Sequence, residues 1–258
     1  MTQRDIPKAG DLVTIPCLSD NYAFLLRAGD RVAVVDVPEA APVLGELDRR
    51  GWTLTDILLT HHHDDHIQGV AEVVASTGAK VWGAKADAHR LPPLDHALAP
   101  GDTVSLGTAE GRVIDVSGHT IGHIAYLFDG VAFTGDSLMA AGCGRLFEGT
   151  PERMHASLEQ FADVPGDTLI ASGHEYTGNN LAFALSLEPD NPDLISRKTE
   201  VERLRAVGEP SVPSTLATER NTNPFLRASS PEMKAATGTT GQSDEATFAA
   251  ARRAKDAF

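Results

Sequence analysis

The chain of 258 residues has little cysteine and no long apolar segment. Its two cysteines, Cys17 and Cys143, are too few for a disulfide framework, and neither belongs to a Cys-x-x-Cys pattern. No stretch approaches the roughly 20 continuous apolar residues of a membrane-spanning helix. Residues 1–8 also lack the apolar segment of a secretory signal. These absences predict a cytoplasmic protein that does not insert into a membrane.

Basic residues are also in short supply. Lysine and arginine number 22 against 36 acidic residues, which gives a formal net charge of -14. Binding to nucleic acid or to an anionic membrane depends on clustered basic side chains, so neither partner is expected. A small anionic substrate would need a local basic patch. The length suits one large domain with an appendage, and we expect a monomer.

Short strand-like segments recur through the first two-thirds of the chain. They lie at residues 12–15, 22–26, 32–35, 57–59, 113–116, 124–128 and 131–133. Helical patterns occur at residues 40–50, 67–77 and 151–161, and the last begins with proline, which the first helical turn tolerates. This mixture predicts an α/β fold with helices on the outer faces of its sheets.

The pattern changes after about residue 174. From residue 179 onward, helical periodicity is interrupted at Pro189, Pro192, Pro210 and Pro213, and no segment has a convincing strand pattern. We therefore expect a sheet-rich domain over residues 1–174 and a small all-helical domain over residues 175–258.

The most informative segment is the run from His61 to His66, which reads His-His-His-Asp-Asp-His. Four imidazoles and two carboxylates in one turn resist burial unless a cation joins them. Side chains alternate along an extended segment, so His61 and His63 face the same side. The chain then turns, which lets Asp65 and His66 face a second position. The run therefore predicts a metal site, with two adjacent positions.

Three further residues that can bind metal each follow a strand-like segment and adjoin glycine: His119, Asp136 and His174. Residues at strand ends converge on one edge of a sheet, where loops can approach a ligand closely. Imidazole and carboxylate without thiolate suit a catalytic site with open positions. We expect zinc, and iron and manganese accept the same ligands.

Residues 60–66 resemble the Thr-His-x-His-x-Asp-His signature of the metallo-β-lactamase superfamily, which folds as an αβ/βα sandwich. The rest of the chain is similar to the glyoxalase II family, the hydroxyacylglutathione hydrolases. The supporting motifs are Gly118-His119-Thr120, Gly122-His123-Ile124, Phe133 to Ser137, Gly142 to Thr150, Gly173 to Thr177, Asn223 to Arg227, and Lys255 to Phe258. They span nearly the whole chain and include the helical tail, so the resemblance extends to the subfamily.

The resemblance implies a set of ligands for two divalent metal ions. The first ion would be bound by His61, His63 and His119, and the second by Asp65, His66 and His174. Asp136 would bridge both ions. A hydroxide between the metals would be the nucleophile, with Asp65 and Asp136 as the catalytic carboxylates that hold the metals.

The resemblance also implies the substrate, a glutathione thioester such as S-D-lactoylglutathione, cleaved to D-lactate and glutathione in methylglyoxal detoxification. The implied substrate-binding residues are Arg145, Phe147, Tyr176, Arg252 and Lys255. Some family members carry lysine and tyrosine in place of Arg145 and Phe147, so the charge is kept and a phenolic hydrogen bond is lost. Residues 175–258 would form the glutathione-binding domain.

Several neighbouring residues have alternative interpretations. His123 competes with His119 because both follow glycine in one short segment; the family favours His119, which makes His123 a hydrogen-bonding neighbour. His62 is expected beside the ligands or at the surface, and Asp64 in solvent. Cys143 is expected to be a buried thiol because no residue nearby in sequence lowers its pKa. The remaining expectations are a core position for Cys17 and surface positions for His89, His96 and His155.

Two other functions fit parts of the pattern. A glutathione persulfide dioxygenase with a single iron shares the fold, but the full second ligand set and the tail from Asn223 to Phe258 favour the hydrolase. A metal-binding scaffold without activity would not need complete ligand sets. The sequence therefore predicts a thioester hydrolase with two metals.

Overall fold

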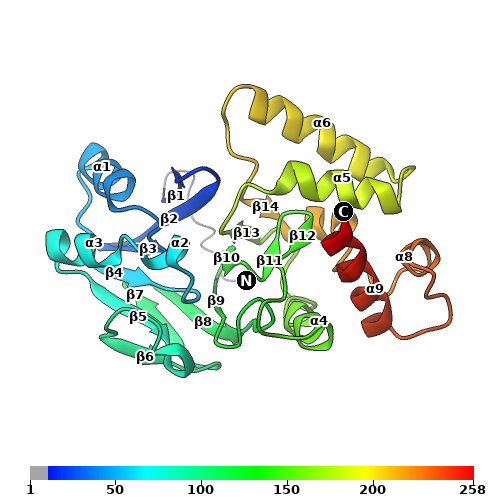
Figure 1. Cartoon of the computed structure of the whole chain (residues 1–258). Helices are drawn as coiled ribbons and strands as arrows, with labels where there is room; N and C mark the ends of the chain where they lie inside the picture. The colour runs from blue at the N-terminus through cyan, green and yellow to red at the C-terminus, as the bar shows by residue number, and fades with distance from the viewer. Residues whose placement is uncertain (1–10) are drawn as a thin grey trace, which may run out of the picture.

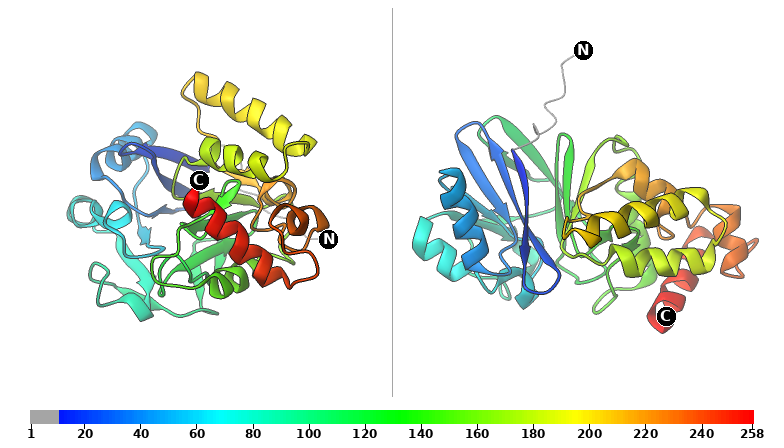
Figure 2. Two further views of the ribbon diagram at one scale, coloured as in Figure 1. Left: turned by 45° about the vertical axis from the view of Figure 1, so that its right-hand side comes forward. Right: turned by 90° about the horizontal axis from the view of Figure 1, so that it is seen from above.

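Two six-stranded sheets face each other in the computed structural model, and helices cover the outer face of each sheet (Figures 1 and 2). The structure describes residues 11–258, so the prediction of no signal sequence in residues 1–8 falls outside the described residues. This arrangement is the predicted αβ/βα sandwich. Helical elements follow it from residue 177 to residue 257, as the tail pattern indicated.

The first sheet has the strand order β1-β2-β3-β4-β5-β6. The first three strands pair antiparallel, and β3 to β6 run parallel. The bounds are Leu12–Cys17 for β1, Asn21–Ala28 for β2, Arg31–Val35 for β3, Asp56–Leu58 for β4, Lys80–Ala84 for β5 and His96–Leu98 for β6. All three residues of β4 are buried, because helices cover the outer face of this sheet and the second sheet covers its inner face.

The second sheet has the order β14-β13-β10-β9-β8-β7. Its bounds are Thr103–Leu106 for β7, Ala109–Asp115 for β8, Ile124–Phe128 for β9, Val131–Gly135 for β10, Leu169–Ser172 for β13 and Ser214–Thr215 for β14. A separate two-stranded hairpin pairs β11 (Leu138–Met139) with β12 (Gly142–Cys143). This hairpin leads directly into the Gly142 to Thr150 motif.

The helices begin with the residues expected at helix starts. Thr150 caps α4 by accepting a hydrogen bond from the Arg153 amide, with proline at the next position. Ser243 caps α9 in the same way. The bounds are Ala40–Arg50 for α1, Asp64–Ile67 for α2, Val70–Thr77 for α3, Lys85–Asp87 for the 3₁₀ helix η1, Pro151–Glu159 for α4, Thr177–Leu187 for α5, Pro192–Ala206 for α6, Leu216–Thr222 for α7, Pro231–Ala236 for α8 and Asp244–Ala257 for α9.

The second sheet is buried on both faces, and its successive residues alternate between two cores. Phe133 on β10 packs between the sheets, with its ring 5.8 Å from that of Phe24. Its neighbour Ala132 faces the helices, where the rings of Phe225 and Phe248 lie 5.2 Å apart. The period-two alternation of a strand thus ties the sandwich to the helical region.

Two predictions about local structure were wrong. The helix expected over residues 67–77 is divided into α2 and α3, because Gly69 lies against another segment: a Cβ there would be 2.7 Å from the Ala40 amide nitrogen. The tail also contains the short strand β14, which extends the second sheet by pairing with β13. Two residues give no periodicity, so the strand has no sequence signal.

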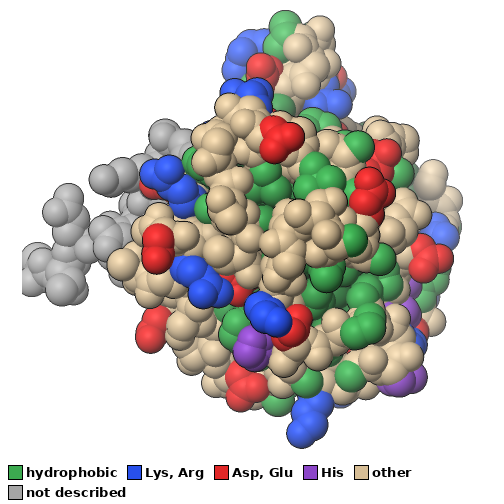
Figure 3. All heavy atoms as spheres, turned by 90° about the vertical axis from the view of Figure 1, so that its left-hand side faces the viewer, with side chains coloured by type: hydrophobic (Ala, Val, Ile, Leu, Met, Phe, Trp, Pro, Cys, Tyr) green, Lys and Arg blue, Asp and Glu red, His purple; other side chains and the backbone are tan. Residues whose placement is uncertain are grey.

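Charged side chains are scattered over the face on the α1 and α3 side, with basic and acidic groups interspersed (Figure 3).

Among residues 11–258, no helix combines the length and apolar character needed to cross a bilayer.

Candidate metal centre

The residues predicted to bind metal come from four segments that meet at one edge of the sandwich. His61 and His63 follow β4, and Asp65 and His66 lie in α2 immediately after them. The other ligand candidates follow strands of the second sheet: His119 after β8, Asp136 after β10 and His174 after β13. The expectation that residues after strand ends converge is therefore met: the residues that follow β4, β8, β10 and β13 lie close together.

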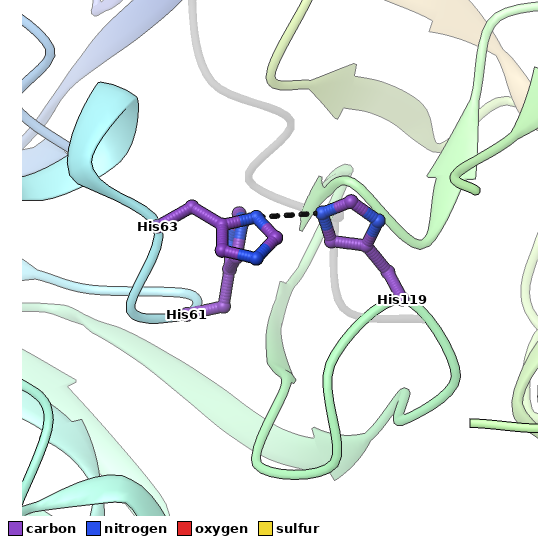
Figure 4. Close-up of side chains that lie close together, drawn as sticks. All are labelled: His61, His63 and His119. Atoms are coloured by element: carbon purple, nitrogen blue, oxygen red, sulfur yellow. Dashed lines mark hydrogen bonds between the residues drawn. The ribbon is translucent and has the colours of Figure 1, made fainter. Parts of the chain in front are cut away.

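The first group is formed by three imidazoles whose ring nitrogens point toward one another (Figure 4). His63 Nδ1 lies 3.2 Å from His61 Nε2 and 2.9 Å from His119 Nε2. A tetrahedral zinc ion with Zn–N bonds of about 2.0–2.1 Å separates its ligand nitrogens by roughly 3.3 Å. The spacing of these three nitrogens therefore suits a common metal.

The second group lies beside the first and contains Asp65, His66 and His174. The Nε2 atoms of the two histidines are 3.3 Å apart, and His174 Nε2 is 3.4 Å from Asp65 Oδ2. Asp136 lies between the groups: its Oδ2 is 3.3 Å from His174 Nε2 and 3.5 Å from His119 Nε2. One carboxylate therefore faces histidines of both groups.

In His61 and His119, the ring nitrogen that points away from the group also makes a hydrogen bond, and this bond leaves the other nitrogen free to bind a cation. His61 donates from Nδ1 to Thr60 Oγ1, and His119 donates from Nδ1 to the Arg145 carbonyl. With the proton on Nδ1, each ring turns an Nε2 lone pair toward its neighbours, which a metal would satisfy. Asp136 Oδ1 is buried without a hydrogen-bond partner, which is costly unless a cation accompanies it. The residues present therefore fit divalent metal ions.

The sequence prediction missed two carboxylates that orient the second group. His66 donates from Nδ1 to Asp36 at 2.9 Å, and His174 donates from Nδ1 to Asp20 at 2.9 Å. Asp36 directly follows β3, so the strand-end argument used for the ligands would have found it. Asp20 lies in the turn between β1 and β2, where no such signal exists.

The neighbouring residues occupy the places expected for them, with one exception. His62 turns away from the ligands and bonds Asp87, and Asp64 is exposed. His123 is buried and accepts a hydrogen bond from the Asp136 amide through Nε2, so it is a neighbour of the site. His155, expected at the surface, is instead half-buried against the Phe248 ring.

The two groups differ in their protonation. Burial lowers the pKa of His61, His63 and His119, so these rings are neutral at pH 7 in the metal-free protein. Burial alone would also lower the pKa of His66 and His174, but Asp136 and the other carboxylates outweigh it and raise the pKa to about 10 and about 11. Metal must displace protons from the second group only.

We therefore expect metal binding at the second group to release protons and binding at the first to release few. Each released proton makes the logarithm of the metal affinity rise by about one per pH unit, as long as the pH stays below the raised pKa values. The affinity of the second position should thus increase from pH 6 to pH 9 while that of the first changes little. Calorimetric titration in buffers of different ionisation enthalpy measures both; equal proton release at the two positions would contradict the expectation.

Gly173 leaves the space in which Asp136 and His66 approach each other. A Cβ at this position would be 2.5 Å from His66 Cε1 and 2.6 Å from Asp136 Oδ1. We expect Gly173→Ala to displace both side chains and to lower metal content below that of the wild type, as measured by elemental analysis. Gly178→Ala is the matched control, because nothing lies within 4 Å of a Cβ there and alanine favours the helix.

A pocket of about 610 Å³ opens directly beside the ligands. All five residues predicted to bind substrate line it: Arg145, Phe147, Tyr176, Arg252 and Lys255. Metal-facing residues line the same pocket, namely His63, Asp65, His119, Asp136 and His174. Residues up to 192 positions apart in sequence, from His63 to Lys255, thus form one cavity.

The aromatic residues of the pocket rest on the histidines. The Tyr176 ring stacks on His174 with centroids 4.6 Å apart, and the Phe147 ring lies 5.3 Å from that of His119. The Cys143 thiol also lines the pocket, but burial raises its pKa to about 11, so it is neutral at pH 7. The predicted buried positions of both cysteines are confirmed.

Three basic residues line the same pocket. Arg252 is buried, donates to the Cys143 carbonyl and to Asp256, and keeps Nε without a partner. The Lys255 ammonium lies over the Phe183 ring. Arg145 is largely exposed, 3.9 Å from Asp256. These three cations supply the local basic patch that an anionic substrate requires in an acidic protein.

Comparison with known sequences agrees with this site. Residues 19–196 match the family model described as "Metallo-beta-lactamase superfamily", and residues 175–258 match "Hydroxyacylglutathione hydrolase C-terminus". The fold, the site and these matches define a metal-dependent hydrolase of the metallo-β-lactamase superfamily. Within it, the chain belongs to the hydroxyacylglutathione hydrolases.

Two relatives show how far the similarity extends. The hydroxyacylglutathione hydrolase of Jannaschia sp. (strain CCS1) is 59% identical over 251 residues, which is 96% of this chain and 98% of the relative. That of Fuscovulum blasticum is 62% identical, over 96% of this chain and 99% of the relative.

Solved structures share the fold at lower identity. The BLEG-1 B3 metallo-β-lactamase aligns with a TM-score of 0.65 and 24% identity, over 83% of this chain and 99% of its own. ETHE1 from Myxococcus xanthus aligns with a TM-score of 0.63 and 23% identity, over 94% of this chain and 96% of its own. At this identity the likeness concerns the fold.

Proposed function

We propose that this protein hydrolyses S-(2-hydroxyacyl)glutathione thioesters, notably S-D-lactoylglutathione, to the 2-hydroxy acid and glutathione. The observation that carries the proposal is the pocket that is lined both by residues of the two metal-binding groups and by three cations. Glutathione has carboxylates remote from its sulfur, so a thioester of glutathione can contact both sets of residues at once.

Two divalent metals would be held by His61, His63 and His119 and by Asp65, His66 and His174, with Asp136 between them. Zinc suits this set of imidazoles and carboxylates, and iron and manganese accept it. When bound, the metals supply a hydroxide near neutral pH and stabilise negative charge on the carbonyl oxygen. The protein's own task is to hold the ligands and to orient the thioester.

Orientation comes from residues on both sides of the pocket. Arg145, Arg252 and Lys255 would bind the glutathione carboxylates, and Phe147 and Tyr176 would flank the thioester beside the histidines. Asp65 and Asp136 stay ionised, because neighbouring histidines hold the pKa of each carboxyl below its usual value. The leaving thiolate needs little protonation, so the neutral Cys143 thiol has no part in the chemistry.

The decay of thioester absorbance with S-D-lactoylglutathione tests the proposal. Metal-loaded protein should hydrolyse it, a chelator should abolish the activity, and added zinc should restore it. No turnover by metal-loaded protein would contradict the proposed reaction.

The persulfide dioxygenase alternative is less well supported. The match of residues 175–258 and the relatives at 59% and 62% identity favour the hydrolase. Oxygen consumption with glutathione persulfide in place of thioester hydrolysis would reverse this choice.

We further propose a catalytic domain over residues 1–174 and a glutathione-binding domain over residues 175–258. The two reduced cysteines accord with a cytoplasmic location. All the proposed ligands and substrate contacts come from one chain, so a monomer suffices for activity.

A further inference from the structure

We infer that Asp20, in the turn between β1 and β2, and Asn21, the first residue of β2, control whether the second metal position is filled. The inference rests on the proposed two-metal function and assigns a positioning role to residues outside the ligand set. It concerns the second group alone, because the side chains of Asp20 and Asn21 bond Asp65 and His174 and, among the described residues, none of the first group.

Asn21 fixes Asp65 by two hydrogen bonds from one amide group. Its Nδ2 donates to the Asp65 carbonyl at 3.0 Å and to Asp65 Oδ2 at 3.0 Å. Asn21 is 4% exposed, whereas the side chain of Asp65 is 42% exposed. A half-exposed carboxylate has many rotamers in solvent, so this buried amide is what orients it toward His174.

Asp20 fixes the other ligand from the adjacent position in the chain. Its carboxylate accepts a hydrogen bond from His174 Nδ1 at 2.9 Å, which leaves Nε2 for the metal side of the ring. Adjacent residues therefore hold two ligands of one group, which are 109 positions apart in sequence.

The backbone connects the turn to the loop of His174. Tyr22 donates its amide to the Gly173 carbonyl at 2.8 Å, and Glu175 donates its amide to the Asp20 carbonyl at 2.8 Å. Asn21 and His174 thus form an isolated antiparallel bridge between the two sheets. Because this bridge holds the turn in register, the positions of Asp20 and Asn21 relative to the second group are set by the main chain.

The first group has separate supports. His61 and His119 are held by Thr60 and by the Arg145 carbonyl, on loops that β1 and β2 do not supply. Removing Asn21 should therefore weaken one metal position and spare the other. Loss of a group that orients a metal ligand lowers metal affinity by roughly 10- to 100-fold.

The test is metal stoichiometry of the full-length protein after dialysis against a competing chelator, measured by elemental analysis with zinc. Asn21→Leu keeps the shape of the side chain and removes its amide. We expect two ions per chain in the wild type and one in Asn21→Leu, with the dissociation constant of the weaker ion raised roughly 10- to 100-fold. Asp20→Ala should give the same selective loss by freeing His174, and it stands in if Asn21→Leu does not fold.

Tyr22→Phe is the matched control from the same strand. It removes the 2.7 Å hydrogen bond from the Tyr22 hydroxyl to Glu175 and touches no ligand, so two ions should remain. Retention of both ions with unchanged affinity in Asn21→Leu and Asp20→Ala would overturn the inference. Equal loss of both ions, or loss in Tyr22→Phe, would also overturn it, because general damage would then explain the result.

Thioester hydrolysis is measured separately on the wild type. If the two-metal wild type does not hydrolyse the thioester, the proposed function fails while the metal stoichiometry still decides the role of Asn21. If the wild type is active but Asn21→Leu retains both ions, only the further inference fails.

Discussion

Replacing Asp136 with alanine should lower kcat/KM for S-D-lactoylglutathione by roughly 10³-fold or more, because bound metals contribute several kcal/mol of charge stabilisation and each 1.4 kcal/mol is tenfold in rate. The side chain is 5% exposed and faces histidines of both groups, at 3.3 Å from His174 and 3.5 Å from His119. Steady-state kinetics and metal analysis of the same preparation measure the effect.

Asp64→Ala is the control for this change. Asp64 belongs to the same histidine-rich run but its side chain is exposed to solvent. Its removal should leave turnover and metal content near those of the wild type. Normal turnover by Asp136→Ala would contradict the proposed mechanism.

Replacing Arg252 with methionine should raise KM for the glutathione thioester by roughly 10- to 100-fold, because a hydrogen bond to a charged group contributes about 1.5–3 kcal/mol. Arg252 lines the pocket but belongs to neither metal-binding group, so kcat should change much less than KM. Its Nε is buried and has no hydrogen-bond partner in the protein. Initial-rate kinetics over a range of thioester concentrations separate the two constants.

Arg253→Met is the matched control, since the adjacent side chain is exposed on the same helix. It removes one positive charge without touching the pocket, and KM should stay near the wild-type value. S-Lactoyl-N-acetylcysteamine, which lacks the glutathione carboxylates, separates binding from folding. An equal rise in KM for this truncated thioester in Arg252→Met would show that the variant disturbs the site in general.

The clustering of the proposed ligand residues was predictable because its signals are local. Alternation along an extended segment separates His61 and His63 from His62, and the structure places these side chains as predicted. His119, Asp136 and His174 were indicated by a second local signal, because each follows a strand-like segment and adjoins a glycine. The helical tail was predictable from periodicity, whereas β14 was missed because a two-residue strand depends on its partner β13.

Asp20 and Asn21, which hold residues of the second group, were beyond sequence reasoning. Asp20 and Asn21 reach Asp65 and His174 only because an isolated bridge joins the two sheets at that point. A turn residue of this kind has no periodicity of its own. Its role depends on which distant loop packs against it.

The sequence by itself determined the chemistry of the site: imidazoles and carboxylates in a spacing that requires cations, in a chain too acidic to bind anions without a local patch. Only the tertiary structure decided that the patch exists. Arg252 lies 109 residues from Cys143 in sequence, yet it donates to the Cys143 carbonyl and faces the same pocket as Asp136. Local patterns follow from the geometry of one strand or helix, but a pocket depends on long-range packing, which no spacing along the chain encodes.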